Sequence, residues 1–146
     1  HLVQVEVDKD TGEIEIQKYV AVEDCGNVIN PMVVEGQILG GIAQGVGQAL
    51  YEHGIYDEDG QLVTGSMLDY TMPRADNFPM IESDRIETPS PSNSLGVKGV
   101  GEMGSITSPP AVVNAVVDAL SDYGVKHIDM PLTSEKIWNL IKTNGG

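Results

Sequence analysis

The feature that most constrains this chain is a predicted helix that contains an unusual number of glycines. Asn30 followed by Pro31 is a typical N-cap and first-turn pair, and the helix is expected over residues 31–52. Its interior holds glycines at positions 36, 40, 41, 45 and 47. At roughly 0.8–1 kcal/mol each relative to alanine, they cost on the order of 4–5 kcal/mol. Because a domain is stable by only about 5–15 kcal/mol, another group must come close to this backbone.

Two explanations of these glycines are open. In the first, small residues let another helix or a sheet pack closely against this one. In the second, they lower a face that binds a polar ligand, because Gln37, Gln44 and Gln48 recur at helical spacing along one side. A solvated stripe of glutamines is the ordinary alternative to the second explanation. The face toward the core is predicted to carry Leu39, Ala43, Val46 and Leu50.

The rest of the chain predicts an α+β fold, with a mixed sheet that includes a β-hairpin and with three packed helices. Apolar and polar residues alternate from Val3 to Val7 and again from Ile14, which predicts a hairpin whose second strand ends near Asp24. A further strand is expected within 80–89. A second helix is predicted to begin at Pro109, with Ser108 as its cap, and a third at Thr133 or Ser134. Residues 1–146 are expected to form a single domain.

Composition excludes several classes of function. The formal net charge of −14 opposes binding to nucleic acid or to an anionic membrane surface. A single cysteine, Cys25, excludes an internal disulfide and a four-thiolate metal site within this chain, and it is expected to be structural. His53 is expected on the surface. The absence of a long apolar run and of a signal-peptide pattern leads us to expect a soluble, cytoplasmic protein.

One loop places a single acid, Glu102, among glycines and just before a double proline, in the stretch GVKGVGEMGSITSPP. Such an acid is most often surface decoration. The loop could also cradle a phosphate, but it lacks the Gly-Lys-Ser/Thr ending of a nucleotide-binding P-loop. Lys98 could be a solvent-facing charge or a contact for an anion. The residues alone leave these alternatives open.

Four blocks in order resemble a known family over residues 3–140. They are DCGNVINPMVVEGQILGGIAQGVGQALYE, TGSMLDYTMPRADNFP, LGVKGVGEMGSITSPPAVVNAVVDAL and MPLTSEKIW. This pattern resembles the carboxyl-terminal part of the molybdopterin-binding catalytic subunit of the molybdenum hydroxylases, which include xanthine dehydrogenase, aldehyde oxidoreductase and aerobic carbon monoxide dehydrogenase.

The resemblance implies roles for three residues. Glu102 corresponds to the family's active-site base, which takes a proton from a hydroxyl at the molybdenum so that its oxygen can attack an electron-poor carbon. Gln37 corresponds to a glutamine that contacts the molybdenum cofactor, and Gly101 supplies backbone beside it. The resemblance implies no direct metal ligand in this chain.

The resemblance also implies an oxidoreductase that hydroxylates an aldehyde, an N-heterocycle or a similar small molecule with water. The molybdenum–molybdopterin cofactor would be shared with the remainder of the subunit, and iron–sulfur and FAD groups would lie only on other chains or segments. The chain alone is expected to be inactive, as a subunit or part of a complex. The alternative is a non-catalytic binding or assembly module with the same fold.

Overall fold

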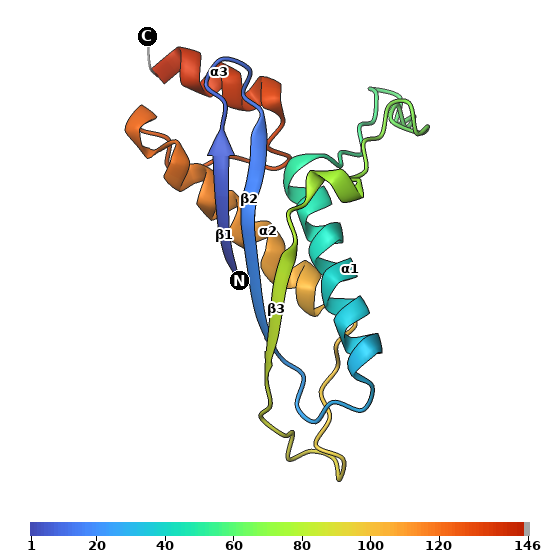
Figure 1. Cartoon of the computed structure of the whole chain (residues 1–146). Coiled ribbons are helices and arrows are strands. Elements are labelled where there is room, and N and C mark those ends of the chain that lie inside the picture. Colours follow the sequence, from blue (N-terminus) through green and yellow to red (C-terminus); the bar gives the residue numbers. More distant parts are fainter. Residues whose placement is uncertain (145–146) are drawn as a thin grey trace.

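The computed structural model describes residues 1–144. Within that range, three strands form one mixed sheet in the order β1-β2-β3, and three α-helices accompany it (Figure 1). The predicted α+β fold with a hairpin and three helices is confirmed. The elements in chain order are β1 (Leu2–Val7), β2 (Ile14–Asp24), α1 (Pro31–Leu50), β3 (Ile81–Ile86), α2 (Met103–Ala119) and α3 (Ser134–Asn144), with short 3-10 turns at Ala75–Asn77 and Ser121–Tyr123.

The amino-terminal hairpin forms as its alternating pattern predicts. β1 and β2 pair antiparallel, with an irregularity between Gln4 and Val5. The Asp8 carboxylate closes the turn by accepting hydrogen bonds from the backbone N–H groups of Asp10, at 2.7 Å, and Thr11, at 3.1 Å. β3 then adds to β2 in parallel, so the carboxyl ends of β2 and β3 lie side by side. The segments that follow these two strands therefore start from the same edge of the sheet.

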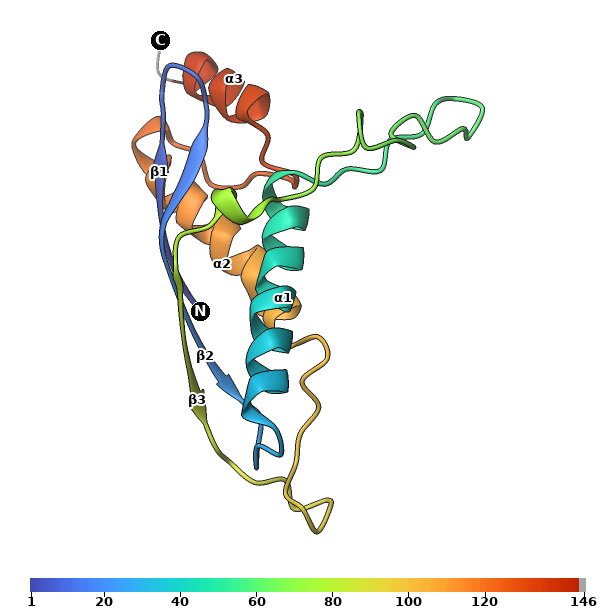
Figure 2. The same cartoon turned by 45° about the vertical axis from the view of Figure 1, so that its right-hand side comes forward.

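Helices α1 and α2 cover one face of the sheet, as the turned view shows (Figure 2). Asn30 caps α1 as predicted, because its side-chain oxygen accepts a hydrogen bond from the N–H of Val33 at 3.2 Å. The predicted core stripe of α1 is partly wrong: Val46 and Leu50 are buried, but Leu39 and Ala43 are only half-buried. Ile38 and Ile42, each one position earlier, are fully buried instead.

Helix α2 begins six residues earlier than predicted. Its first residue is Met103, and Glu102 rather than Ser108 occupies the N-cap position. Pro109 and Pro110 therefore lie inside the helix, where they cannot donate the hydrogen bonds that the carbonyls four residues earlier would accept. The acid singled out in the sequence consequently stands at the start of a helix instead of in the middle of a loop.

Residues 52–74 leave the end of α1 and project from the body of the molecule (Figure 2). The predicted turn at Asp59 and Gly60 lies within this segment, with Gly60 at a φ of +80° and its N–H donating to the Asp57 carbonyl at 3.0 Å. Farther along, the side chains of Met67 and Leu68 are exposed. None of the helices in residues 1–144 is long and apolar enough to span a membrane.

Candidate functional site

Helices α1 and α2 cross through glycines, which accounts for part of the glycine load of α1. A Cβ built at Gly41 would lie 3.0 Å from the backbone nitrogen of Ser105 and 3.1 Å from the Cα of Gly104. A Cβ at Gly45 would lie 1.8 Å from the Ser108 hydroxyl oxygen. The explanation by close helix packing is therefore confirmed for Gly41 and Gly45. This crossing places the first turn of α2 directly against the middle of α1.

Two other glycines of α1, Gly36 and Gly40, face open space in the described part of the chain. A Cβ at Gly36 or Gly40 would meet no atom within 4 Å. The predicted glutamine row lies along the same exposed side, and Gln37, Gln44 and Gln48 are all exposed. Close packing within this chain consequently does not explain Gly36 and Gly40. Their side of α1 is an uncovered strip of amide side chains and bare backbone.

Glu102 lies at the edge of this strip because Gly104, two residues later, is wedged against α1. A Cβ at Gly104 would lie 2.4 Å from the carbonyl oxygen of Ile38 and 2.6 Å from the nitrogen of Ile42. The start of α2 and the turn of α1 that carries Gln37 are thus adjacent. Glu102 and Gly101 directly precede the turn of α2 that packs against Ile38, the neighbour of Gln37 in α1.

The Glu102 side chain is exposed and makes no capping hydrogen bond to the residues described. Its own carbonyl oxygen accepts a hydrogen bond from the Ser105 hydroxyl at 2.9 Å. Gly101, immediately before it, is exposed, and a Cβ there would meet nothing within 4 Å. A helix N-terminus leaves its first backbone N–H groups without partners in the helix, and it favours negative charge. Within the described residues, the Glu102 carboxylate is therefore exposed at the start of α2 and makes no capping contact there.

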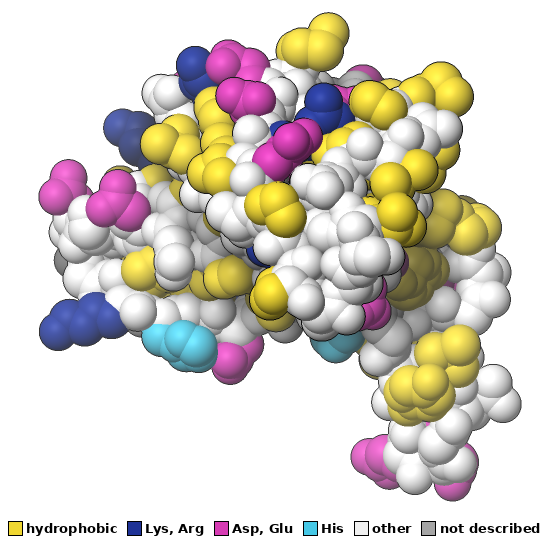
Figure 3. All heavy atoms as spheres, turned by 90° about the horizontal axis from the view of Figure 1, so that it is seen from below, with side chains coloured by type: hydrophobic (Ala, Val, Ile, Leu, Met, Phe, Trp, Pro, Cys, Tyr) yellow, Lys and Arg dark blue, Asp and Glu magenta, His cyan; other side chains and the backbone are white. Residues whose placement is uncertain are grey.

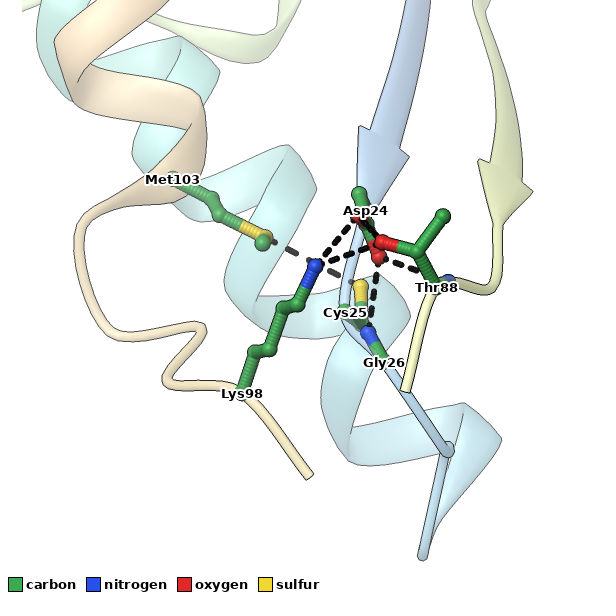
Figure 4. Close-up of polar contacts among 6 residues, drawn as sticks. All are labelled: Asp24, Cys25, Gly26, Thr88, Lys98 and Met103. Atoms are coloured by element: carbon green, nitrogen blue, oxygen red, sulfur yellow. Dashed lines mark hydrogen bonds and ion pairs between the residues drawn. The ribbon is translucent and has the colours of Figure 1, made fainter. Parts of the chain in front are cut away.

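The loop before Glu102 is fastened to the end of β2. The backbone N–H of Asn27 donates to the carbonyl of Gly96 at 3.0 Å, and that of Lys98 donates to the carbonyl of Cys25 at 3.1 Å. The Lys98 ammonium lies 2.5 Å from a carboxylate oxygen of Asp24 and 2.6 Å from the Thr88 hydroxyl oxygen (Figure 4). Lys98 is therefore not a free solvent-facing charge, because Asp24 and Thr88 both contact its ammonium, and a contact with an external anion stays a prediction.

The Asp24–Lys98 contact was not predicted from the sequence, because 74 residues separate the two side chains and no local pattern links them. The ammonium of Lys98, followed by the Thr88 hydroxyl and backbone N–H groups, holds the pKa of Asp24 far below its usual value of 3.8. Asp24 is consequently an anion under all ordinary conditions.

Cys25 is buried beneath this loop, as expected for a structural cysteine. Its sulfur lies 3.8 Å from the sulfur of Met103, the first residue of α2 (Figure 4). Burial raises the pKa of the Cys25 thiol. His53 is exposed, as predicted. Residues 1–144 contain no cluster of three or more His, Cys, Asp or Glu side chains that could hold a metal ion.

The end of the molecule that carries these loops exposes large hydrophobic side chains. The view from below shows them scattered between polar atoms and backbone (Figure 3). In the β2–α1 connection and the first turn of α1, Ile29 is 71% exposed and Met32 79%, and Leu95 in the facing loop is 61% exposed. Hydrophobic side chains that are scattered singly over a surface in this way are common and do not by themselves mark an interface.

Comparison with known proteins agrees with this architecture. Residues 1–79 match the family model of the molybdopterin cofactor-binding domain. The chain is 50% identical over 137 residues to the nicotine 6-hydroxylase large subunit of Paenarthrobacter nicotinovorans, and 41% identical over 142 residues to the carbon monoxide dehydrogenase large chain of Hydrogenophaga pseudoflava. The crystal structure of quinoline 2-oxidoreductase from Pseudomonas putida 86 superposes with a TM-score of 0.91 at 48% identity.

These matches cover almost all of this chain but a small part of each relative. They span 94%, 97% and 96% of the chain, and 17%, 18% and 18% of the nicotine, carbon monoxide and quinoline enzymes respectively. The matched region therefore corresponds to one portion of a much larger polypeptide. With the family model covering more than half of its residues, this chain belongs to the molybdopterin cofactor-binding family, as part of a molybdopterin-binding subunit of the molybdenum hydroxylases.

Proposed function

We propose that this chain forms one wall of the active site of a molybdenum hydroxylase, with Glu102 as the base. The observation that carries the proposal is the position of Glu102, which stands exposed and uncapping at the start of α2, beside the turn of α1 that bears Gln37. The Glu102 carboxylate does not cap the helix and so does not stabilise the fold through a hydrogen bond of that kind. Its exposed position supports a role as a base toward a ligand that is bound against α1 and α2.

The exposed residues fit the molybdopterin cofactor. This ligand is polar and carries a phosphate, so it requires hydrogen-bond donors more than an apolar pocket. Gln37 offers a neutral amide, and Gly99 and Gly101 leave backbone that no side chain of this chain covers. Because a Cβ at Gly40 would also meet only open space, a ligand could approach α1 closely. Gln37 and Gly101 would hold the cofactor, while the rest of its surroundings would come from polypeptide outside this chain.

The cofactor, when bound, supplies the redox centre that accepts electrons from the substrate. Glu102 contributes a carboxylate oxygen that accepts a proton from the attacking hydroxyl group and so makes that oxygen a better nucleophile. General-base assistance of this kind contributes about 10²–10⁴-fold to a rate. The contact between Gly104 and Gly41 fixes the backbone at the start of α2, from which the Glu102 side chain extends.

An N-heterocycle is the substrate class that we favour among aldehydes, N-heterocycles and similar small molecules. Two of the relatives, at 50% and 48% identity, are named for nicotine and quinoline, and both molecules contain a pyridine-type ring. In such a ring the carbon next to nitrogen is electron-poor and open to attack by an oxygen nucleophile. Iron–sulfur and FAD groups would lie on other chains or segments, and the isolated chain would not turn over substrate.

Replacement of Glu102 by Gln in the whole enzyme tests the proposal. Glutamine keeps the size of the side chain but cannot accept the proton, so turnover should fall by about 10²–10⁴-fold while molybdenum content stays unchanged. Glu135→Gln, on the exposed side of α3, is the matched control and should leave the rate unaltered. A fully active Glu102→Gln enzyme would remove the base assignment. A wild-type complex without molybdenum would favour a non-catalytic assembly module.

A further inference from the structure

Asp24 gathers the ends of three segments around one carboxylate (Figure 4). It is the last residue of β2, and Thr88 follows β3 by two positions. One Asp24 oxygen accepts the backbone N–H groups of Gly26, at 3.0 Å, and Thr88, at 3.1 Å. The other oxygen accepts the Thr88 hydroxyl and the Lys98 ammonium, the latter at 2.5 Å. A single side chain therefore connects the strand ends to the loop that leads to Glu102.

Lys98 is the last side chain before Glu102 that makes a hydrogen bond or ion pair within the described residues. Its ammonium is shared between Asp24 and the Thr88 hydroxyl oxygen, 2.6 Å away. Between Lys98 and Glu102, Gly99 and Gly101 have no side chain, and only the half-buried Val100 packs against the core. The ion pair is partly shielded, since about one third of each side chain is exposed, 35% for Lys98 and 34% for Asp24. The Lys98 ammonium makes two short contacts at once, to Asp24 and Thr88, whereas an ordinary solvent-exposed ion pair contributes little to stability.

We propose that Asp24 and Lys98 are positioning residues, which set the position of the Glu102 carboxylate by fastening its loop to the carboxyl ends of β2 and β3. The expected effect on turnover rests on the proposed function of Glu102, whereas the expected effect on loop mobility does not. The fastening is on one side of Glu102, through Lys98, and the wedge of Gly104 against α1 is on the other. With both ends of the segment held, its short glycine backbone has little freedom to move the carboxylate.

The direct alternative is that Lys98 contacts the substrate or the cofactor. The two roles predict different behaviour of Asp24. A lysine that acts through Asp24 requires its partner, so removing either charge should have the same effect. A lysine that binds a ligand would act without Asp24, so Asp24→Asn would leave function intact while Lys98→Met would abolish it.

The test compares Lys98→Met, Lys98→Arg, Asp24→Asn and the double variant Lys98→Met/Asp24→Asn in the whole molybdenum enzyme. Asparagine keeps one oxygen to accept the N–H groups of Gly26 and Thr88, so it removes mainly the ion pair. Lys18→Met is the matched control. Lys18 forms an ion pair with Glu82 at 3.1 Å, which also joins β2 to β3 but involves no residue of the loop before Glu102. The readouts are kcat, KM, molybdenum content and amide hydrogen exchange of peptides that cover residues 95–104.

We expect Lys98→Met and Asp24→Asn each to raise exchange in residues 95–104 and to lower kcat by on the order of tenfold to a hundredfold, because a small displacement of a reacting group has effects of this size. KM and molybdenum content should not change. The double variant should be no worse than Lys98→Met, since both changes break one interaction. Lys98→Arg should recover most of the rate, and Lys18→Met should match the wild type.

Wild-type exchange and rate in Lys98→Met would overturn the proposal. So would a loss of molybdenum or a raised KM in Lys98→Met that Asp24→Asn does not share. The exchange readout does not depend on Glu102 being the base. If Glu102→Gln were active but Lys98→Met still loosened the loop, the base assignment would fail while the fastening role stood.

Discussion

Gly104 and Ile38 lie so close together that a side chain at position 104 would collide with the backbone of α1. A Cβ on Gly104 would come within 2.4 Å of the Ile38 carbonyl oxygen, a separation that real Cβ atoms essentially never show. Both groups at this contact are backbone, so neither can turn aside as a flexible side chain would. The contact therefore fixes how far the start of α2, and with it Glu102, stands from α1.

Gly104→Ala should accordingly destabilise the subunit and displace Glu102. Overpacking of a tight contact typically costs about 1–3 kcal/mol, so the free energy of unfolding should fall by at least that amount. Turnover should fall more steeply than the fraction of folded protein. Thermal or urea unfolding, together with the rate per molybdenum atom, would check this expectation.

Gly36→Ala is the matched control for this change. Gly36 lies in the same helix pair, and a Cβ there would meet no atom of the described chain within 4 Å. Alanine is a better helix former than glycine by up to about 1 kcal/mol, so the variant should be as stable as the wild type or more so. If Gly36→Ala were also destabilising, another part of the subunit would have to pack against that face.

The sequence predicted the elements better than their ends and long-range contacts. The hairpin and the N-cap at Asn30 follow from local patterns, and both are confirmed. The start of α2 was missed because Gly104 and two prolines have low helix propensity, whereas close packing against α1 outweighs that local cost. The core stripe of α1 was displaced by one residue because Ile38 and Leu39 are equally apolar, and only the packing partner distinguishes them.

In the candidate site, too, some residues could be predicted from the sequence and others could not. Glu102, Gln37 and Gly101 were predicted from a family resemblance, and the start of α2 after Glu102 lies against Ile38, next to Gln37. The Asp24–Lys98 pair carries no local signal, because it depends on β3 adding in parallel beside β2. Parallel pairing is decided by tertiary packing, so a charge pair that depends on it becomes visible only in the folded structure.

Gln37→Ala should weaken retention of the molybdenum cofactor. A neutral hydrogen bond contributes about 0.5–1.5 kcal/mol, which corresponds to at most about a tenfold loss of affinity. Molybdenum content after prolonged dilution, measured against protein concentration, would detect this loss. Gln48→Ala, an exposed glutamine on the same side of α1 but three turns away from Gln37, should retain the metal like the wild type. Equal retention by both variants would contradict the role of Gln37.

Cys25 should react slowly with alkylating reagents in the folded enzyme. Its side chain is 2% exposed, and burial raises the pKa of the thiol, so little of the reactive thiolate exists at neutral pH. Mass spectrometry of the peptide that contains Cys25, after brief treatment with iodoacetamide, should show almost no label until the protein is unfolded in urea. Rapid labelling of the native enzyme would mean that the loop over Cys25 opens often.

The fastening of the Glu102 loop should resist acid. The pKa of Asp24 is lowered by Lys98 first and then by Thr88 and backbone N–H groups. A carboxyl whose pKa is lower in the folded state contributes stability that is present above its unfolded pKa and is lost as the pH falls through its folded pKa. Hydrogen exchange of residues 95–104, corrected for the intrinsic effect of pH, should therefore stay constant on acidification until the pH is below 3.8. Peptides from α1 serve as the internal reference for global unfolding, and loosening of this loop alone at pH values well above 3.8 would show that another titrating group holds it.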